Sequence, residues 1–257
     1  MRLSTRVHLK QTRLDRLYQR GSSKALMPRG DGEGLTAVLL NTAGGVTGGD
    51  HLQTRAEAGT DTQLTLTTQA SERGYRARPT ETGLIESHLT VQAGAVLHWL
   101  PQETILYDGA ALSRKLNVSL AGDAAFLAVE SFILGRAAHN ETVHDLRLTD
   151  HWRVRRNGRL IYADALRLHG DPALLTQGPA MLNGHRAFAS ILLAAPDADR
   201  HLNQLRAILA ETGGASLIRD GVLAARMTAP DGFALRRTLI PALEALRAAK
   251  LPRPWSI

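Results

Sequence analysis

The sequence predicts a protein dominated by β-strands, with two α-helices near its C-terminal end. Apolar and polar residues alternate with period two through most of the first two-thirds of the chain, whereas leucines at helical spacing appear only late. No fixed-period repeat, low-complexity tract or linker interrupts the sequence. Because all-β domains commonly reach ~200–250 residues, we expect residues 1–257 to form one domain.

The expected strands follow one another along the chain. Residues 126–134 are apolar on both faces, which is typical of a central strand covered on two sides. Asn157-Gly158, between two alternating runs, predicts a tight hairpin of the type I′ class. The alternating segments are 62–67, 85–91, 112–120, 146–155 and 160–168.

Two segments have helical spacing instead. Leucines lie on one face of residues 200–212, and Gly213-Gly214 predicts the end of that helix. The second helix contains Leu239, Leu243 and Leu246, and Pro241 predicts its start or a kink.

The composition excludes several classes of protein. Without cysteine, the chain has no disulfides, zinc fingers, iron–sulfur ligands or thiol catalysis, so any metal must be held by His, Asp or Glu. No apolar run approaches the ~18–20 residues that span a bilayer, and the charged N-terminus lacks the apolar region of a signal peptide. We therefore expect a cytoplasmic protein without a membrane partner.

The positive charge is concentrated at the N-terminus. Residues 1–29 hold eight Lys/Arg against one acid, Asp15, whereas the remaining residues balance at 23 against 23. Such a stretch suits nucleic acid, an acidic protein surface, or simply a solvated edge. Tyr18 is the only aromatic residue in it, so the stacking platforms of single-strand binders are missing and a nucleic-acid partner is disfavoured.

The glycine-rich segment 39–50 is the most unusual local feature. It lacks the Gly-Lys-Ser/Thr ending of a phosphate loop, and Asp50 stands where such a loop needs a cation. A tight strand-to-strand turn is the better interpretation.

Two carboxylates fall on faces that the pattern buries. Glu130 shares its face with Phe126 and Phe132, and Asp164 shares its face with Tyr162. Buried carboxylates need a partner or a proton. One interpretation is a structural ion pair, for example with Arg136 or Arg167, and the other is an internal wet cavity through which a polar ligand or a cation passes.

Signals for catalysis are weak. The ten histidines form no HxH or HExxH motif, and no GxSxG elbow is present. A polysaccharide-active β-helix protein would show aromatic sugar platforms and paired carboxylates, and aromatics make up only 4% of this chain.

Five segments together resemble the family of the urease accessory protein UreD, called UreH in some species. The resemblance extends from about residue 10 to the C-terminus, and its specificity lies in the order and spacing of the set. The segments are 39–50 (LLNTAGGVTGGD), 67–76 (TTQASERGYR), 99–110 (WLPQETILYDGA), 130–136 (ESFILGR) and 251–255 (LPRPW).

The resemblance implies a β-helix-like fold with two helices and a maturation factor that is not an enzyme. Its implied partners are apo-urease, UreF and the GTPase UreG, so that GTP would be used by UreG and this chain would hold no tightly bound cofactor. Nickel would pass transiently through an interior passage. Asp50 matches a motif position of the family, and Glu130 and Asp164 are further candidate passage residues.

Overall fold

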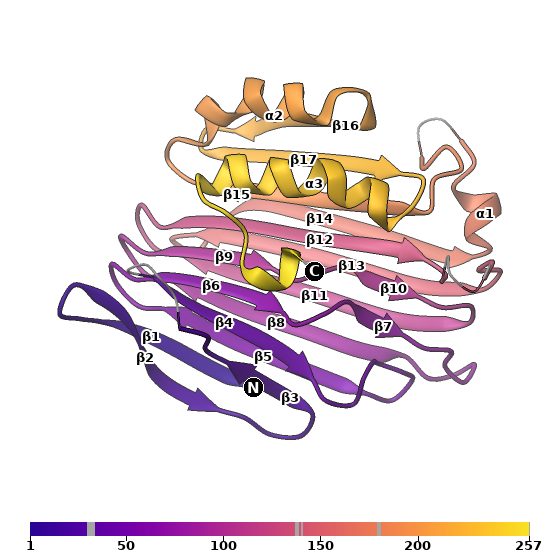
Figure 1. Cartoon of the computed structure of the whole chain (residues 1–257), viewed down its shortest axis with the longest axis horizontal. Coiled ribbons are helices and arrows are strands. Elements are labelled where there is room, and N and C mark those ends of the chain that lie inside the picture. Colours follow the sequence, from indigo (N-terminus) through magenta and orange to yellow (C-terminus); the bar gives the residue numbers. More distant parts are fainter. Residues whose placement is uncertain (30–33, 137–138, 140, 179–180, 257) are drawn as a thin grey trace.

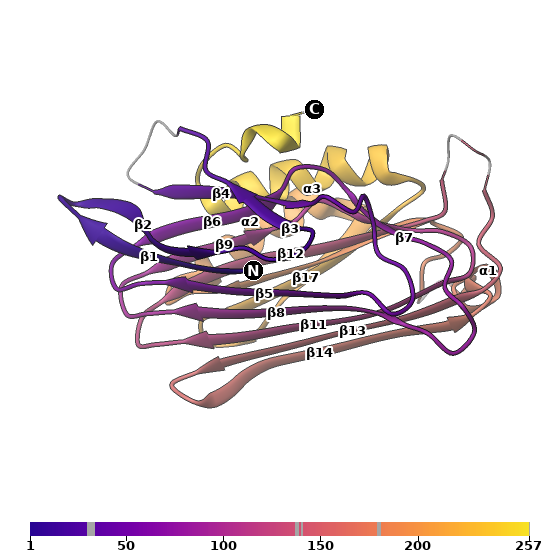
Figure 2. The ribbon, with the colours of Figure 1, turned by 90° about the horizontal axis from the view of Figure 1, so that it is seen from below.

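Two stacked β-sheets form the body of the molecule in a computed structural model that describes residues 1–29, 34–136, 139, 141–178 and 181–256 (Figures 1 and 2). Sheet A has seven strands, in the order β14 (Arg159–Gly170), β13 (Leu146–Arg156), β11 (Ala110–Leu120), β8 (Gly83–Val91), β5 (His51–Ala58), β1 (Arg2–His8) and β2 (Gln11–Tyr18). Sheet B has ten, in the order β16 (Gly213–Arg219), β17 (Val222–Ala229), β15 (Ala187–Ala194), β12 (Ala125–Leu134), β9 (Val96–Leu100), β6 (Gln63–Thr68), β4 (Leu35–Asn41) and β3 (Ser23–Leu26). Off this order, β10 (Thr104–Leu106) pairs with β12, and β7 (Glu72–Gly74) pairs with β10.

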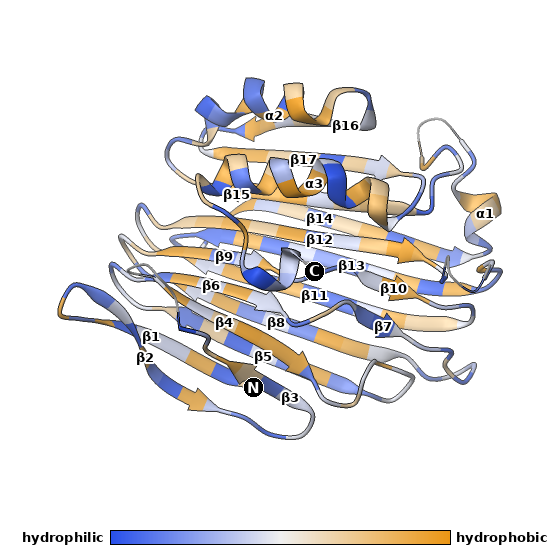
Figure 3. Ribbon diagram, viewed as in Figure 1, coloured by the Kyte–Doolittle hydropathy of each residue, from blue (hydrophilic) through white to orange (hydrophobic). Residues whose placement is uncertain are grey.

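The middle of the chain winds as a solenoid. From β4 to β13, the long strands alternate between sheets B and A, and each pairs in parallel with the strand one coil away in its own sheet. Hydrophobic and hydrophilic residues alternate along the strands (Figure 3), because one side of each strand faces the space between the sheets. The predicted strand-dominated, β-helix-like architecture is confirmed.

The predicted hairpin is also confirmed. Asn157 and Gly158 join β13 to β14, and their φ angles are +49° and +79°. Two successive positive φ values are the mark of a type I′ turn, which matches the twist of the flanking strands.

Both predicted helices are present, and both pack on the outer face of sheet B. Buried leucines of α2 (Leu202–Leu209) and α3 (Gly232–Arg247) join β12, β15 and β17 in one apolar cluster. This packing explains why residues 126–134 are apolar on both faces. Short 3₁₀ turns lie at 198–201, 210–212 and 253–256.

The predicted end of the first helix was wrong, and the position of Pro241 narrows the prediction for the second. The helix α2 ends at Leu209, before Ala210 with φ +46°, and Gly213-Gly214 instead begin β16. A Cβ on Gly213 would lie 2.3 Å from the carbonyl oxygen of Arg226, so this glycine allows a close approach of β17. Pro241 lies inside α3, so of the two predicted alternatives, a start or a kink, the start is excluded.

A one-turn helix was not predicted. It is α1 (Pro172–Leu175), whose N-cap Asp171 accepts a hydrogen bond from the backbone N–H of Ala173 at 2.8 Å. An Asp-Pro start is a recognised helix signal, but one turn is too short to show any periodicity. Among the described residues, no helix has the length and apolarity needed to cross a membrane.

Candidate functional site: a cavity and a polar belt between the sheets

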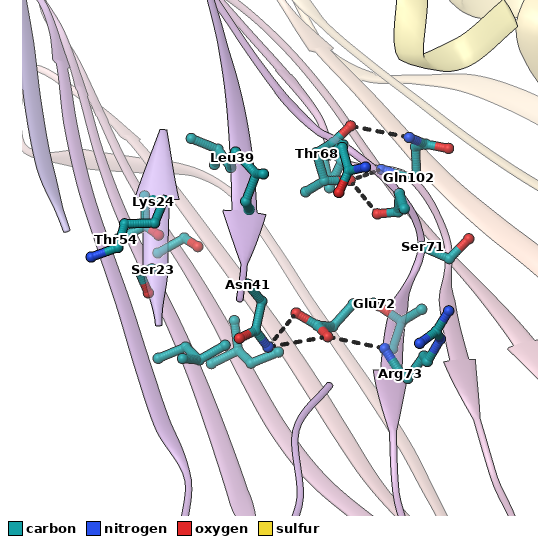
Figure 4. A pocket seen from close by; sticks show the side chains of 18 of the residues that line it. Ser23, Lys24, Leu39, Asn41, Thr54, Thr68, Ser71, Glu72, Arg73 and Gln102 are labelled. Carbon is teal, nitrogen blue, oxygen red and sulfur yellow. Dashed lines mark hydrogen bonds between the residues drawn. The ribbon is translucent and has the colours of Figure 1, made fainter. Parts of the chain in front are cut away.

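A cavity of about 220 Å³ lies between the two sheets. Sheet A contributes side chains from β5, β8 and β11, and sheet B contributes side chains from β4, β6 and β9. Figure 4 shows polar groups around its wall. They include Asn41, Thr54, Thr68, Glu72, Ser87, Gln102, Thr104 and Arg114, beside apolar Leu39, Ile85 and Trp99.

Hydrogen bonds tie the walls of the cavity together. The side-chain amide of Asn41 donates to the two carboxylate oxygens of Glu72 at 3.2 and 3.4 Å. Gln102 donates through its backbone N–H to the hydroxyl of Thr68 at 2.9 Å and through its side chain to the Thr68 carbonyl at 3.0 Å (Figure 4). Burial raises the pKa of Glu72, the acid on this wall, although the hydrogen bond from Asn41 acts in the opposite direction.

The glycine-rich segment 39–50 forms the predicted turn from β4 to β5 and packs against β7. The backbone N–H of Val46 donates to the Arg73 carbonyl at 2.7 Å, and that of Tyr75 donates to the Val46 carbonyl at 2.8 Å. A Cβ on Gly45 would lie 2.2 Å from Cε2 of Tyr75, so only glycine allows this approach.

Asp50 ends this turn at the surface. It is exposed, and its Oδ2 accepts a hydrogen bond from the backbone N–H of Thr47 at 2.9 Å. It does not line the cavity. The structure therefore gives Asp50 a role in the turn and places it apart from the two other predicted site residues.

Glu130 lies in the interior beside the cavity and is buried, as predicted, with 3% of its surface exposed. Its carboxylate accepts a hydrogen bond from the indole N–H of Trp99 at 2.8 Å and forms an ion pair with Arg114, a cavity residue that is 6% exposed. Arg114 also donates to the hydroxyl of Thr104 at 3.1 Å. The expectation of an ion pair for Glu130 is confirmed, but its suggested partners, Arg136 and Arg167, were wrong because the cation comes from the facing sheet.

Asp150 is a second buried carboxyl group beside Arg114. It is 7% exposed, its Cα is paired with that of Arg114 across β11 and β13, and its Oδ2 accepts from the indole N–H of Trp152 at 2.9 Å. Burial raises the pKa of Asp150 to about 7; Arg114 opposes this rise and Glu130 adds to it. Burial therefore favours the protonated form of this carboxyl group.

Asp164 lies where β14 forms the edge of sheet A. Its side chain is 17% exposed, so the predicted burial is only partial, and its partner is Arg226 of β17 in sheet B, not Arg167. The hydroxyl of Tyr162 lies 3.4 Å from Asp164 Oδ2. An ion pair thus joins the two sheets at this edge.

These charged side chains form a polar belt, which we define as Arg114, Glu130, Asp150, Asp164 and Arg226. The first three are buried, Asp164 is half-buried and Arg226 is exposed at the sheet edge. The belt divides the space between the sheets into two apolar clusters. On β11, for example, Leu112 belongs to one cluster and Leu116 to the other, with Arg114 between them. A core is rarely interrupted in this way, because each buried charge carries a desolvation cost. The belt leads from the cavity to the β14–β17 edge.

Sequence reasoning missed Arg114 and Asp150, although the signal was present. Both lie on the apolar side of segments predicted as strands, 112–120 and 146–155, at positions where the alternation requires a hydrophobic residue.

The carboxylate oxygens of the belt are spread along it and are not gathered in one place. Within the described ranges, no cluster of three or more His, Cys, Asp or Glu side chains is placed to hold a metal ion. Scattered carboxylates suit weak, exchangeable contacts with a cation better than permanent binding.

The motif segments meet at this site. Residues of 39–50, 67–76 and 99–110 line the cavity, and Glu130 of 130–136 binds its wall residue Arg114. From 251–255, the indole N–H of Trp255 donates to the hydroxyl of Thr67 at 3.1 Å. Segments far apart in sequence are thus held in one place.

Comparison with known proteins shows the family of this chain. The family model described as UreD urease accessory protein matches residues 1–256. The chain belongs to this family. It is 47% identical to the urease accessory protein UreD of Ruegeria pomeroyi over 100% of both chains, and 46% identical to that of Rhizobium rhizogenes over 96% of this chain and 90% of the relative. Its role is that of a urease accessory protein.

The raised pKa of Asp150 predicts a pH-dependent stability. An unfolded Asp loses its proton near pH 3.8, whereas the folded chain holds it to about 7, so the free energy of unfolding falls as the pH rises between these values. Asp150→Asn should remove this component. Urea unfolding at pH 5 and pH 8 should therefore show a smaller loss of stability for the variant than for the parent. Asp220→Asn, at an exposed turn, is the control; an equal loss in all three chains would contradict the assignment.

Proposed function

We propose that this chain is a maturation factor with no catalytic activity of its own, which binds apo-urease, UreF and UreG in the cytoplasm and carries nickel along the polar belt. GTP is used by UreG in this scheme. The family supports a role in urease maturation. The observation that carries the passage is the belt itself, a line of charged groups through an otherwise apolar core that begins at a cavity and ends at a sheet edge.

The chemistry of the belt suits a cation in transit. Carboxylate oxygens bind a divalent cation reversibly, whereas thiolates would trap nickel, and the chain contains no cysteine. The arginine at the centre is compensated, because Arg114 faces the two carboxyl groups of Glu130 and Asp150. With the pKa of Asp150 at about 7, its carboxyl group releases a proton as an arriving cation replaces it.

The three predicted passage residues then take different places. Glu130 lies at the centre of the route and Asp164 at its edge. Asp50, at the exposed turn beside β5, is proposed as a surface contact for nickel before entry.

The experiment that tests this function uses cells that carry the urease operon. Deleting this gene should leave abundant urease protein with little nickel and little activity, and restoring the gene should recover both. Urease activity and the nickel content of the purified enzyme are measured together. Unchanged activity and nickel after deletion would refute the proposal.

A further inference from the structure

The outer face of sheet A is open. The helices α2 and α3 lie on the far side of sheet B, and no helix covers β5, β8, β11 or β13 from outside in the described part of the chain (Figure 2). A broad, uncovered sheet face at this position is available to a partner.

Three arginines share one row across this face. Strand register places Arg2, Arg55, His88, Asn117 and Arg153 in one row across β1, β5, β8, β11 and β13. Neighbouring strands lie ~4.8 Å apart, so the row extends about 19 Å. Arg155 lies two residues further along β13, and Arg2, Arg16, Arg55 and His88 surround a shallow hollow on the same face.

The acids of the face do not neutralise this row. Glu86 binds Lys115 at 3.1 Å and His51 at 3.1 Å, and Glu57 accepts from the side chain of Gln92 at 2.8 Å. Among the residues that the structure describes, no carboxylate lies within salt-bridge distance of Arg2, Arg55, Arg153 or Arg155. Like charges on neighbouring strands destabilise a sheet, and a partner with opposite charge removes this repulsion.

We propose that this arginine face, defined by Arg2, Arg55, Arg153 and Arg155, docks a carboxylate-rich protein surface. The guanidinium group pairs with carboxylates in a bidentate geometry, and complementary charges steer such encounters. A single-stranded nucleic acid fits less well, because Tyr18, at the end of the row, is the only aromatic side chain described beside it and bases would find few rings to stack on. The face lies on the opposite side of sheet A from the cavity and the polar belt, so its test does not depend on nickel transport.

The test uses the whole chain and labelled poly-L-glutamate as the acidic probe, with fluorescence anisotropy at about 150 mM NaCl. The variant Arg55→Glu/Arg153→Glu reverses two charges on the face. Its matched control, Arg237→Glu/Arg253→Glu, makes the same change in net charge at exposed residues on the helical side. Circular dichroism verifies that each variant is folded, and Arg55→Gln/Arg153→Gln, which removes the two charges without reversing them, replaces the reversal if that variant fails to fold.

The face variant should weaken binding of the probe about tenfold and the glutamine variant about threefold, whereas the control should stay within about twofold of the parent. Equal weakening by the face variant and the control would mean that only net charge matters, and would overturn the proposal. A duplex DNA probe that binds the parent more tightly than poly-L-glutamate and is lost in the face variant would also overturn it, in favour of nucleic acid.

Discussion

Arg114→Met is expected to destabilise the fold by about 3–5 kcal/mol, the largest stability effect that the structure predicts. The substitution keeps most of the side-chain volume but removes the cation that neutralises Glu130. A carboxylate 3% exposed then has no opposite charge in contact, and Asp150 is a second acid beside it. Urea unfolding at neutral pH measures the loss.

A second variant separates charge from packing. Arg114→Met/Glu130→Gln leaves two neutral side chains of similar size, and the amide oxygen of the new glutamine can still accept the hydrogen bond from the Trp99 indole. We expect it to recover most of the lost stability, since replacing both members of a buried ion pair costs less than removing one. Lys115→Met, at the adjacent exposed position, should stay within about 1 kcal/mol of the parent. If Arg114→Met matches Lys115→Met, the ion pair contributes nothing and the account of the belt fails.

The belt also shows what the sequence alone can predict. The strand patterns identified β6, β8 and β11 to β14 but missed β1 to β5 and β15 to β17, and the same reasoning found Glu130 and Asp164, since each interrupts an apolar face. Arg114 and Asp150 interrupt apolar faces in the same way. An interpretation that recorded only the apolar members of each face passed over them.

The partners of the predicted acids were beyond local reasoning. Glu130 binds a side chain of β11 across the gap between the sheets, and Asp164 binds one of β17, 62 residues later. Such pairs depend on how the sheets stack and on the register of strands distant in sequence. Arg136 and Arg167 were suggested because they are close in sequence to Glu130 and Asp164, whereas the actual partners lie on the facing sheet. The cavity is a product of the same stacking, and no segment alone predicts it.

Glu130→Gln is expected to lower the activation of urease more than tenfold while leaving the chain folded and its assemblies intact. In the parent, Arg114 faces two carboxyl groups, so one carboxylate remains for a passing cation. Once position 130 is neutral, the repulsion that helps to raise the pKa of Asp150 is gone, and Asp150 ionises to neutralise Arg114. The centre of the belt then has no spare negative charge. Stability should change little, because Asp150 replaces Glu130 as the charged partner of Arg114 and the substituted amide preserves the contact with Trp99.

The measurement is urease activity and nickel per urease in cells where the operon carries the variant, together with co-purification of urease with this chain. Asp50→Ala is the comparison, because Asp50 lies at the surface and outside the cavity. If urease loses much of its nickel with Glu130→Gln and less with Asp50→Ala, nickel delivery depends on the interior of the belt. Full activation by Glu130→Gln would show that nickel does not need this carboxylate, and the belt would then be a structural ion-pair network. Loss of co-purified urease would instead assign Glu130 to assembly, because nickel could not be delivered to an enzyme that is not bound.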